Sequence, residues 1–175
     1  DYDRAAIELL RPYQPDISVN AGYMLIAPVL CRVHRMINLH PALPGGPAGT
    51  WQQVIWELIA RRANESGAMV HVVTEELDAG PVISFCRFPV RGAGLDQLWV
   101  EAEARPVAEL KKAPGEGLPL FKAIRQAGIM RERPLLVHTL VAIAEGRLSV
   151  AGAGTRPADD LTEGVERAIS GAQPR

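Results

Sequence analysis

The stretch that decides the fold of this chain begins Asn38-Leu39-His40-Pro41 and ends His71-Val-Val-Thr-Glu-Glu-Leu-Asp78-Ala-Gly-Pro-Val-Ile83. Between the two blocks lie a loop rich in proline and glycine and a pattern typical of a helix. An amide and an imidazole two residues apart are therefore followed, about one crossover later, by a second imidazole and a carboxylate. Such groups together can polarise a carbonyl, stabilise an oxyanion and move a proton.

Outward from this stretch, the apolar pattern predicts an α/β fold, in which helices and strands alternate. Thr50 is expected to cap the helix that follows it, and Pro134 to begin a new helix late in the chain. The link 75–81 is short, so the strands that it joins are expected to be antiparallel neighbours. Strands are predicted at 17–21, 36–39, 68–74 and 82–90, and helices at 2–13, 28–34, 51–64, 95–112 and 119–146.

The composition is that of an ordinary globular protein. The chain has 175 residues, of which 47% are hydrophobic and 22% charged, with a net charge of −1. This balance argues against a nucleic-acid partner, and no apolar run reaches the ~18–20 residues that span a bilayer. Cys31, Cys86 and the four histidines show no metal-ligand spacing, and with no signal-peptide pattern they indicate a cytoplasmic protein without a metal. One domain is expected over residues 1–150, followed by a weakly specified tail at 151–175.

Asn38 and His40 stand at the end of the predicted strand 36–39, where ligands bind in open α/β sheets. Residues two apart on an extended segment point to the same side, so both side chains can reach one atom. Asn38 could cap the strand end through its own backbone, or could donate a hydrogen bond to a developing oxyanion. His40 could be a buried histidine satisfied by the backbone, or the acid or base beside Asn38.

Asp78 and His71 likewise admit two interpretations. Asp78 could be a turn residue, or a carboxylate that keeps His40 protonated or relays a proton. His71 could be a buried structural histidine or a group that orients the neighbouring amide. Glu75 and Glu76 are predicted to be solvated carboxylates of the turn.

The pattern Asn38-x-His40-Pro41, followed by His71-Val-Val-Thr-Glu-Glu-Leu-Asp78-x-Gly-Pro-Val-Ile, resembles the 10-formyltetrahydrofolate-dependent formyltransferases. Within that family the second block is most similar to the phosphoribosylglycinamide formyltransferases. The segment 15–24 resembles the strand and turn that line the folate pocket, so the resemblance covers roughly residues 2–90.

The resemblance implies a role for each residue of the pattern. Asn38 would donate a hydrogen bond to the formyl oxygen, and His40 would stabilise the tetrahedral intermediate and pass on a proton. Asp78 would pair with His40 and order a water, and His71 would orient Asn38. The family uses 10-formyltetrahydrofolate as co-substrate and no metal. The pterin would be held by Met24, Leu25, Ile26, Glu75, Glu76, Leu77 and Asp78, and a ribose of the substrate by Glu132.

The resemblance also implies a Rossmann-like, mostly parallel sheet with an antiparallel strand pair after the active site. The family's fold begins with a further strand–helix repeat that carries a glycine-rich phosphate-binding turn. This sequence shows no such turn, so the N-terminal half-sheet is expected to be missing. The sheet edge left open would then be covered by a homodimer or a companion segment.

The leading hypothesis is formyl transfer from 10-formyltetrahydrofolate to the amine of glycinamide ribonucleotide, a step of purine biosynthesis. Its partners would be small molecules, without nucleic acid or membrane. One alternative is a related formyltransferase or a formyltetrahydrofolate deformylase, with an amino sugar or water as acceptor. Another is a folate-binding module without turnover.

Overall fold

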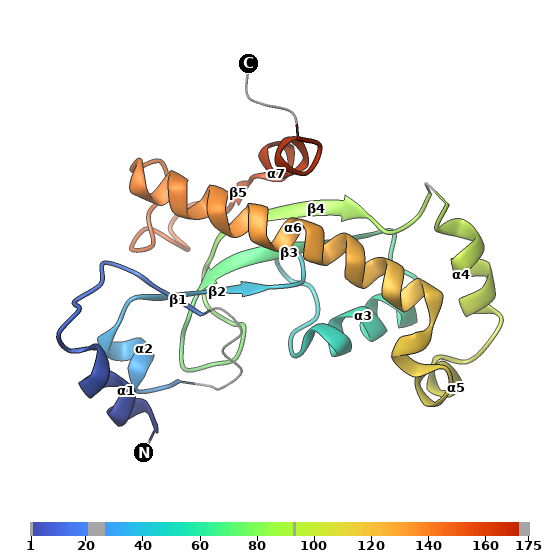
Figure 1. Cartoon of the computed structure of the whole chain (residues 1–175), viewed down its shortest axis with the longest axis horizontal. Coiled ribbons are helices and arrows are strands. Elements are labelled where there is room, and N and C mark those ends of the chain that lie inside the picture. The colour runs from blue at the N-terminus through green and yellow to red at the C-terminus, as the bar shows by residue number, and fades with distance from the viewer. Residues whose placement is uncertain (1, 21–26, 93, 172–175) are drawn as a thin grey trace.

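The computed structural model describes residues 2–20, 27–92 and 94–171, which form an α/β structure around one five-stranded sheet (Figure 1). The outer pairs of strands are parallel and the two inner pairs, β2 with β3 and β3 with β4, are antiparallel. The predicted α/β class and the antiparallel pair after residue 40 are confirmed. In sheet order, which is also chain order, the strands are β1 (Ser18–Asn20), β2 (Met36–His40), β3 (Glu65–Val72), β4 (Val82–Pro89) and β5 (Asp159–Asp160).

Helices cover the sheet and extend beyond one end of it (Figure 1). The longest, α6, runs across one face of the sheet and contacts β3 and β4, as well as α3, α4 and α7. The predicted helix at 95–112 is divided at Pro106, because a proline cannot donate the backbone hydrogen bond of a helix interior. The helices are α1 (Tyr2–Leu10), α2 (Leu30–Val33), α3 (Trp51–Ala60), α4 (Asp96–Glu103), α5 (Val107–Lys112), α6 (Pro119–Ala144) and α7 (Thr162–Ile169), with a 3-10 turn at Gly115–Gly117.

Two large clusters of buried side chains fill the space between these layers. The first joins α3 to α4, α5 and α6, and holds Trp56 and Phe121, whose rings lie 4.9 Å apart. The second lies between the sheet and helices α6 and α7, and includes the fully buried Ile37, Val70 and Leu135. Since this second cluster packs β2 and β3, polar residues at the ends of these strands stand on a rigid support.

The start of α3 is defined by a capping box. The Thr50 hydroxyl accepts a hydrogen bond from the Gln53 backbone N–H, and the Gln53 side-chain oxygen accepts one from the Thr50 backbone N–H. This reciprocal pair confirms the predicted cap and satisfies two donors that a helix start leaves unpaired. The helix ends at Ala60, before the predicted 64, because the chain turns at Arg62, where φ is +52°.

Pro134 does not begin a new helix, contrary to the prediction, but lies inside the continuous α6. A proline in a helix interior removes one backbone hydrogen bond and costs about 3 kcal/mol. The carbonyl that loses its partner belongs to Met130, which is 45% exposed, so water can replace the bond. Packing on both sides, with Ile124 before and Leu135 after the proline buried, holds the two halves in line.

The segment after residue 150, expected to be weakly specified, contains β5 and α7. The backbone of β5 extends the sheet beside Ser84 and Phe85, and Val165 of α7 is fully buried. A sequence signal for this helix exists, because Leu161, Val165 and Ile169 repeat at a spacing of four and all pack in the second cluster.

Gly80 is required by the close approach of the link 75–81 to β3. A Cβ atom at this position would lie 1.7 Å from the carbonyl oxygen of Val72. Gly80→Ala is therefore expected to lower the free energy of unfolding by about 2–4 kcal/mol, measured by urea denaturation. In the control Gly117→Ala the nearest atom would be 3.7 Å away, and a change within about 0.5 kcal/mol is expected. If Gly80→Ala and Gly117→Ala were equally stable, the close contact between Gly80 and the Val72 carbonyl oxygen would be contradicted.

Candidate functional site

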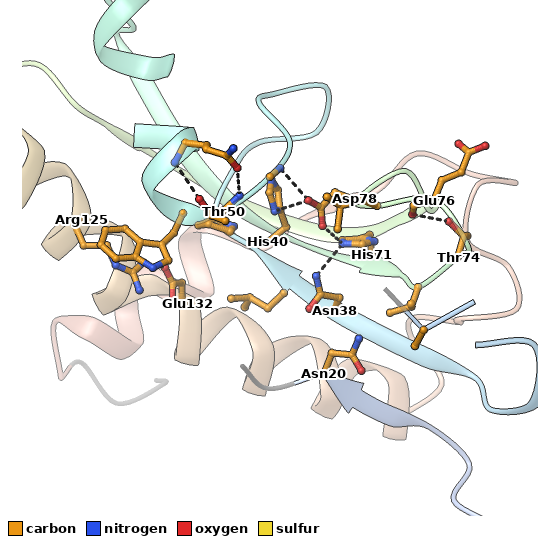
Figure 2. A pocket seen from close by; sticks show the side chains of 18 residues that line it. Asn20, Asn38, His40, Thr50, His71, Thr74, Glu76, Asp78, Arg125 and Glu132 are labelled. Carbon is orange, nitrogen blue, oxygen red and sulfur yellow. Dashed lines mark hydrogen bonds and ion pairs between the residues drawn. The ribbon is translucent and has the colours of Figure 1, made fainter. Parts of the chain in front are cut away.

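A cavity of about 340 Å³ opens where β2 ends, between the segment after β3 and the start of α3 (Figure 2). Its lining comes from β1, β2, β3, the segment 73–78, the first turn of α3 and the middle of α6. Ligands of open α/β sheets bind at the carboxyl ends of strands. The cavity has that location with respect to β2.

Three polar residues form a row across the sheet at this cavity. Asn20 in β1 is the register partner of Asn38 in β2, and Asn38 is the partner of His71 in β3. Register partners on adjacent strands share one face of the sheet, and all three residues line the cavity. His40 follows Asn38 by two residues and lines it as well. The sheet therefore brings the predicted amide and both imidazoles together.

The burial of His71 decides which of its nitrogens donates. Loss of solvation lowers the pKa of His71 below its ordinary value of 6.5, so the ring is neutral at pH 7. Its Nδ1 lies 2.9 Å from the Val72 carbonyl oxygen and donates to it. Nε2 is then the acceptor, and it receives a hydrogen bond from Asn38 Nδ2 at 3.3 Å. His71 thereby fixes the orientation of the Asn38 amide, which keeps a second N–H for a group in the cavity.

Asp78 lies between the two imidazoles (Figure 2). Its Oδ2 is 3.4 Å from Nδ1 of His40 and accepts a hydrogen bond from the Gly49 backbone N–H at 3.1 Å, while Oδ1 is 3.6 Å from Nε2 of His71. The carboxylate is 6% exposed. The residue has a φ of +51°, a left-handed conformation that aspartate tolerates better than most residues. Asp78 is thus a turn residue, and the turn aims its carboxylate at His40.

His40 has both ring nitrogens against oxygen atoms. Nε2 lies 2.8 Å from the carbonyl oxygen of Pro47, which can only accept, and Nδ1 faces Asp78. A doubly protonated ring satisfies both contacts. Because the residue is 2% exposed, a ligand reaches Nε2 only by displacing Pro47. Among Asn38, His40 and Asp78, it is therefore Asn38 whose hydrogen-bond donor a ligand can reach directly.

The turn after β3 divides the residues that the resemblance assigned to the pterin. Glu76 and Leu77 line the cavity. Glu75 does not line it, since its carboxylate forms a two-point ion pair with the exposed Arg32 of α2. This ion pair lowers the pKa of Glu75, so the carboxylate stays charged at the surface, as expected for a solvated turn residue.

The other end of the cavity is lined by Glu132, which forms an ion pair with Arg125. The resemblance assigned Glu132 to a ribose of the substrate, and the structure brings it to the same cavity as Asn38. The predicted Met24, Leu25 and Ile26 lie outside the described residues.

Among the cavity residues that sequence reasoning missed are Asn20, Trp51 and Arg125. Asn20 ends a strand as Asn38 does, and that parallel was a usable signal. The Arg125 guanidinium lies over the Trp51 ring, 4.6 Å from its centroid. No local motif marks this pair, because it forms only when α6 crosses the sheet.

The lowered pKa of His71 predicts a fold that is sensitive to acid. Below pH 6.5 the unfolded chain binds a proton on this ring before the folded chain does. Stability is therefore complete above that pH and falls below it, by up to about 1.4 kcal/mol per pH unit, until the folded ring titrates. Urea denaturation at about pH 7 and about pH 5.5 should show this loss, and His71→Gln should reduce it. An NMR titration that places the His71 midpoint above 6.5 would refute the argument.

Other chemistries find less support in the described part of the chain. No group of three or more His, Cys, Asp or Glu side chains gathers there as metal ligands. Cys86 is buried, which raises the pKa of its thiol to about 11 and keeps it protonated. Within the same residues, no helix has the length and apolar character needed to cross a membrane.

The chain is similar in sequence to proteins of one known family. A family model described as Formyl transferase matches residues 1–95. The chain is 38% identical over 94 residues to phosphoribosylglycinamide formyltransferase of Escherichia coli, covering 51% of this chain and 42% of that protein. It is 33% identical over 100 residues to the protein of the same name from Dictyostelium discoideum, covering 51% and 48%. The chain thus spans less than half the length of these two relatives.

One solved structure is similar over most of the chain. It is a formyltetrahydrofolate deformylase from Pseudomonas syringae, with a TM-score of 0.52 and 26% sequence identity, and it covers 82% of this chain and 40% of that one. The similarity extends past residue 95, so the helices and strands beyond the family match take part in it.

Proposed function

Because the chain belongs to the formyl transferase family, we propose that it transfers a formyl group from 10-formyltetrahydrofolate to a primary amine. The acceptor that we propose is glycinamide ribonucleotide, since two similar proteins are named phosphoribosylglycinamide formyltransferase. The reaction would belong to purine biosynthesis. The observation that supports the proposal most directly is the gathering of Asn38, His40 and Asp78 at one cavity.

The side of the cavity formed by segment 73–78 offers both apolar and polar surface, which supports binding of a reduced folate there. A volume of about 340 Å³ falls within the range of small-molecule sites. Val73 and Leu77 offer apolar surface for a flat ring, and Thr74 and Glu76 offer polar groups for its edge. When bound there, the co-substrate supplies an activated formyl carbonyl.

In this proposal Asn38 stabilises the negative charge that develops on the formyl oxygen as the amine attacks. One N–H of its amide is held by His71, and the other donates to the oxygen. Because the amide is fixed before the reaction begins, no reorganisation is needed during the attack.

Asp78 and His40 move the protons. The attacking amine must lose a proton, and the nitrogen that leaves the formyl group must gain one. The Asp78–His40 pair, at 3.4 Å, exchanges a proton directly or through a water. The Pro47 contact ties the ring to the loop 41–49, so a shift of that loop would free Nε2 of His40 for the formyl oxygen.

Hydrolysis of the same co-substrate is a second candidate function. It is favoured by the similarity to a formyltetrahydrofolate deformylase over 82% of this chain. Water would then replace the amine, while Asn38, His40 and Asp78 would keep the same tasks.

The test is incubation of the whole chain with 10-formyltetrahydrofolate, with and without glycinamide ribonucleotide. Formylated glycinamide ribonucleotide and formate are both measured. We expect the formylated product when the acceptor is present and no formate in its absence. Formate release without acceptor would assign the deformylase reaction instead, and folate binding without either product would assign a binding module.

A further inference from the structure

Helix α6 carries two arginines that are each stacked on an aromatic ring and paired with a glutamate. In Arg131 each of the three guanidinium nitrogens donates a hydrogen bond. It lies over Phe88, 4.6 Å from the ring centroid, and its Nε and one terminal nitrogen donate to Glu166 at 2.6 and 3.1 Å. The other terminal nitrogen donates to the Ala127 carbonyl oxygen at 2.8 Å. Arg131 therefore has a structural task that occupies all three of its nitrogens.

Arg125 has the same surroundings but uses fewer of its donors. It lies 4.6 Å from the Trp51 ring centroid, and one terminal nitrogen donates to Glu132. Among the described residues, no hydrogen bond engages its Nε or its other terminal nitrogen. The side chain is only 24% exposed, and it lines the cavity. Unused donors of a largely buried guanidinium are costly unless water or a ligand in the cavity accepts from them.

The position of Arg125 is fixed by a rigid support. Trp51 is the first residue of α3, directly after the N-cap Thr50, and its ring packs 5.9 Å from that of Phe121. The indole covers one face of the guanidinium and Glu132 holds one edge. The remaining edge, with Nε and the second terminal nitrogen, forms the fork that matches a planar or tetrahedral oxyanion.

Arg125 also stands on the side of the cavity that the acceptor would occupy. Figure 2 shows Arg125 and Glu132 on one side of Asn38 and His40, and Thr74 and Glu76 on the other. If the pterin binds along segment 73–78, as in the proposed function, the amine must approach from the side of Arg125. The body of the acceptor then extends toward α3 and α6.

We propose that Arg125 binds an anionic group of the amine acceptor, a carboxylate or a phosphate, through the donors that Glu132 leaves unused. This inference rests on the proposed function of the same cavity. Glu132 cancels much of the long-range field of Arg125, so recognition acts through short hydrogen bonds and not through steering. Arg125 is thus a residue that determines which amines are accepted.

The first test pairs a change in the protein with a change in the acceptor. The acceptors are glycinamide ribonucleotide and its ribonucleoside counterpart, which lacks the phosphate. Arg125→Gln should raise the KM for the ribonucleotide by about 10–100-fold, the usual effect of losing a hydrogen bond to a charged group, and should change kcat little. The KM for the ribonucleoside should be the same in both proteins. Arg125→Lys, which keeps the charge but not the fork, should fall between them.

The second test measures binding alone, so it does not depend on turnover. Inorganic phosphate and acetate are titrated into the wild type and both Arg125 variants at constant ionic strength, by calorimetry. Arg131→Gln is the matched control, because it loses the same kind of stacked and paired arginine outside the cavity. We expect it to bind each anion as the wild type does. Tight binding of phosphate or of acetate by the wild type identifies which anion the site prefers.

The two proposals fail in different ways. If no acceptor is formylated but anion binding depends on Arg125, the proposed function fails and the role of Arg125 stands. If formylation occurs and Arg125→Gln leaves both KM and anion binding unchanged, the role of Arg125 is wrong. Loss of binding in Arg131→Gln to the same degree would also overturn it, since the effect would then come from α6 as a whole.

Discussion

Asn38→Ala is expected to lower kcat by about 10²–10³, the usual effect of removing one donor to a developing oxyanion. The variant removes the N–H that faces the cavity, and it leaves Nε2 of His71 without its hydrogen bond. The second loss should lower the free energy of unfolding by only about 1 kcal/mol. Single-turnover formyl transfer and thermal denaturation of the same preparation separate the two effects.

Asn20→Ala is the matched control for this variant. Asn20 carries the same amide, lines the same cavity and is the register partner of Asn38, but no hydrogen bond to His71 is found for it among the described residues. We expect kcat to change much less in Asn20→Ala. If Asn38→Ala unfolds the chain while its folded fraction keeps full activity, Asn38 is a structural residue.

Asp78→Asn is expected to lower kcat by about 10²–10⁴, the range that a positioned proton-transfer group contributes. Asparagine tolerates the φ of +51° at this position, and its side-chain oxygen can still accept from the Gly49 backbone N–H. The fold should therefore be retained. The neutral amide cannot exchange a proton with His40, so the proton transfer that the Asp78–His40 pair performs should be lost.

Glu75→Gln serves as the comparison, because this neighbouring carboxylate is exposed and bonded to Arg32 outside the cavity. A surface ion pair of this kind contributes little, and we expect a change in kcat below about twofold. A kcat in Asp78→Asn as high as that of Glu75→Gln would remove Asp78 from the mechanism.

The local parts of this structure could be predicted because local chemistry determines them. Thr50 with Gln53 forms a capping box wherever a helix follows, and alternation around Asn38 and His40 places both on one face of a strand. Because the link before Pro81 is short, the strands on either side of it must pair in antiparallel orientation. The cavity therefore receives Asn38, His40 and Asp78 from features that extend over a few residues each.

The parts that escaped prediction depend on contacts between distant segments. Pro134 would end an isolated helix, but α6 continues through it because Leu135 is packed against the sheet. The strand β5 is two residues long and exists only beside β4. Arg125 reaches the cavity because a helix that begins at Pro119 crosses the sheet. None of these outcomes is contained in a short window of sequence.

The row of Asn20, Asn38 and His71 determines where the chain can accept insertions and deletions. One residue inserted into or deleted from segment 36–40 reverses which side chains face the cavity, so Leu39 or Ile37 would stand where the amide belongs. Such a change removes the site without altering any of its residues. The loop 41–49 has no such alternation, and we expect additions there to be tolerated as long as Pro47 still reaches His40 and the Gly49 backbone still reaches Asp78.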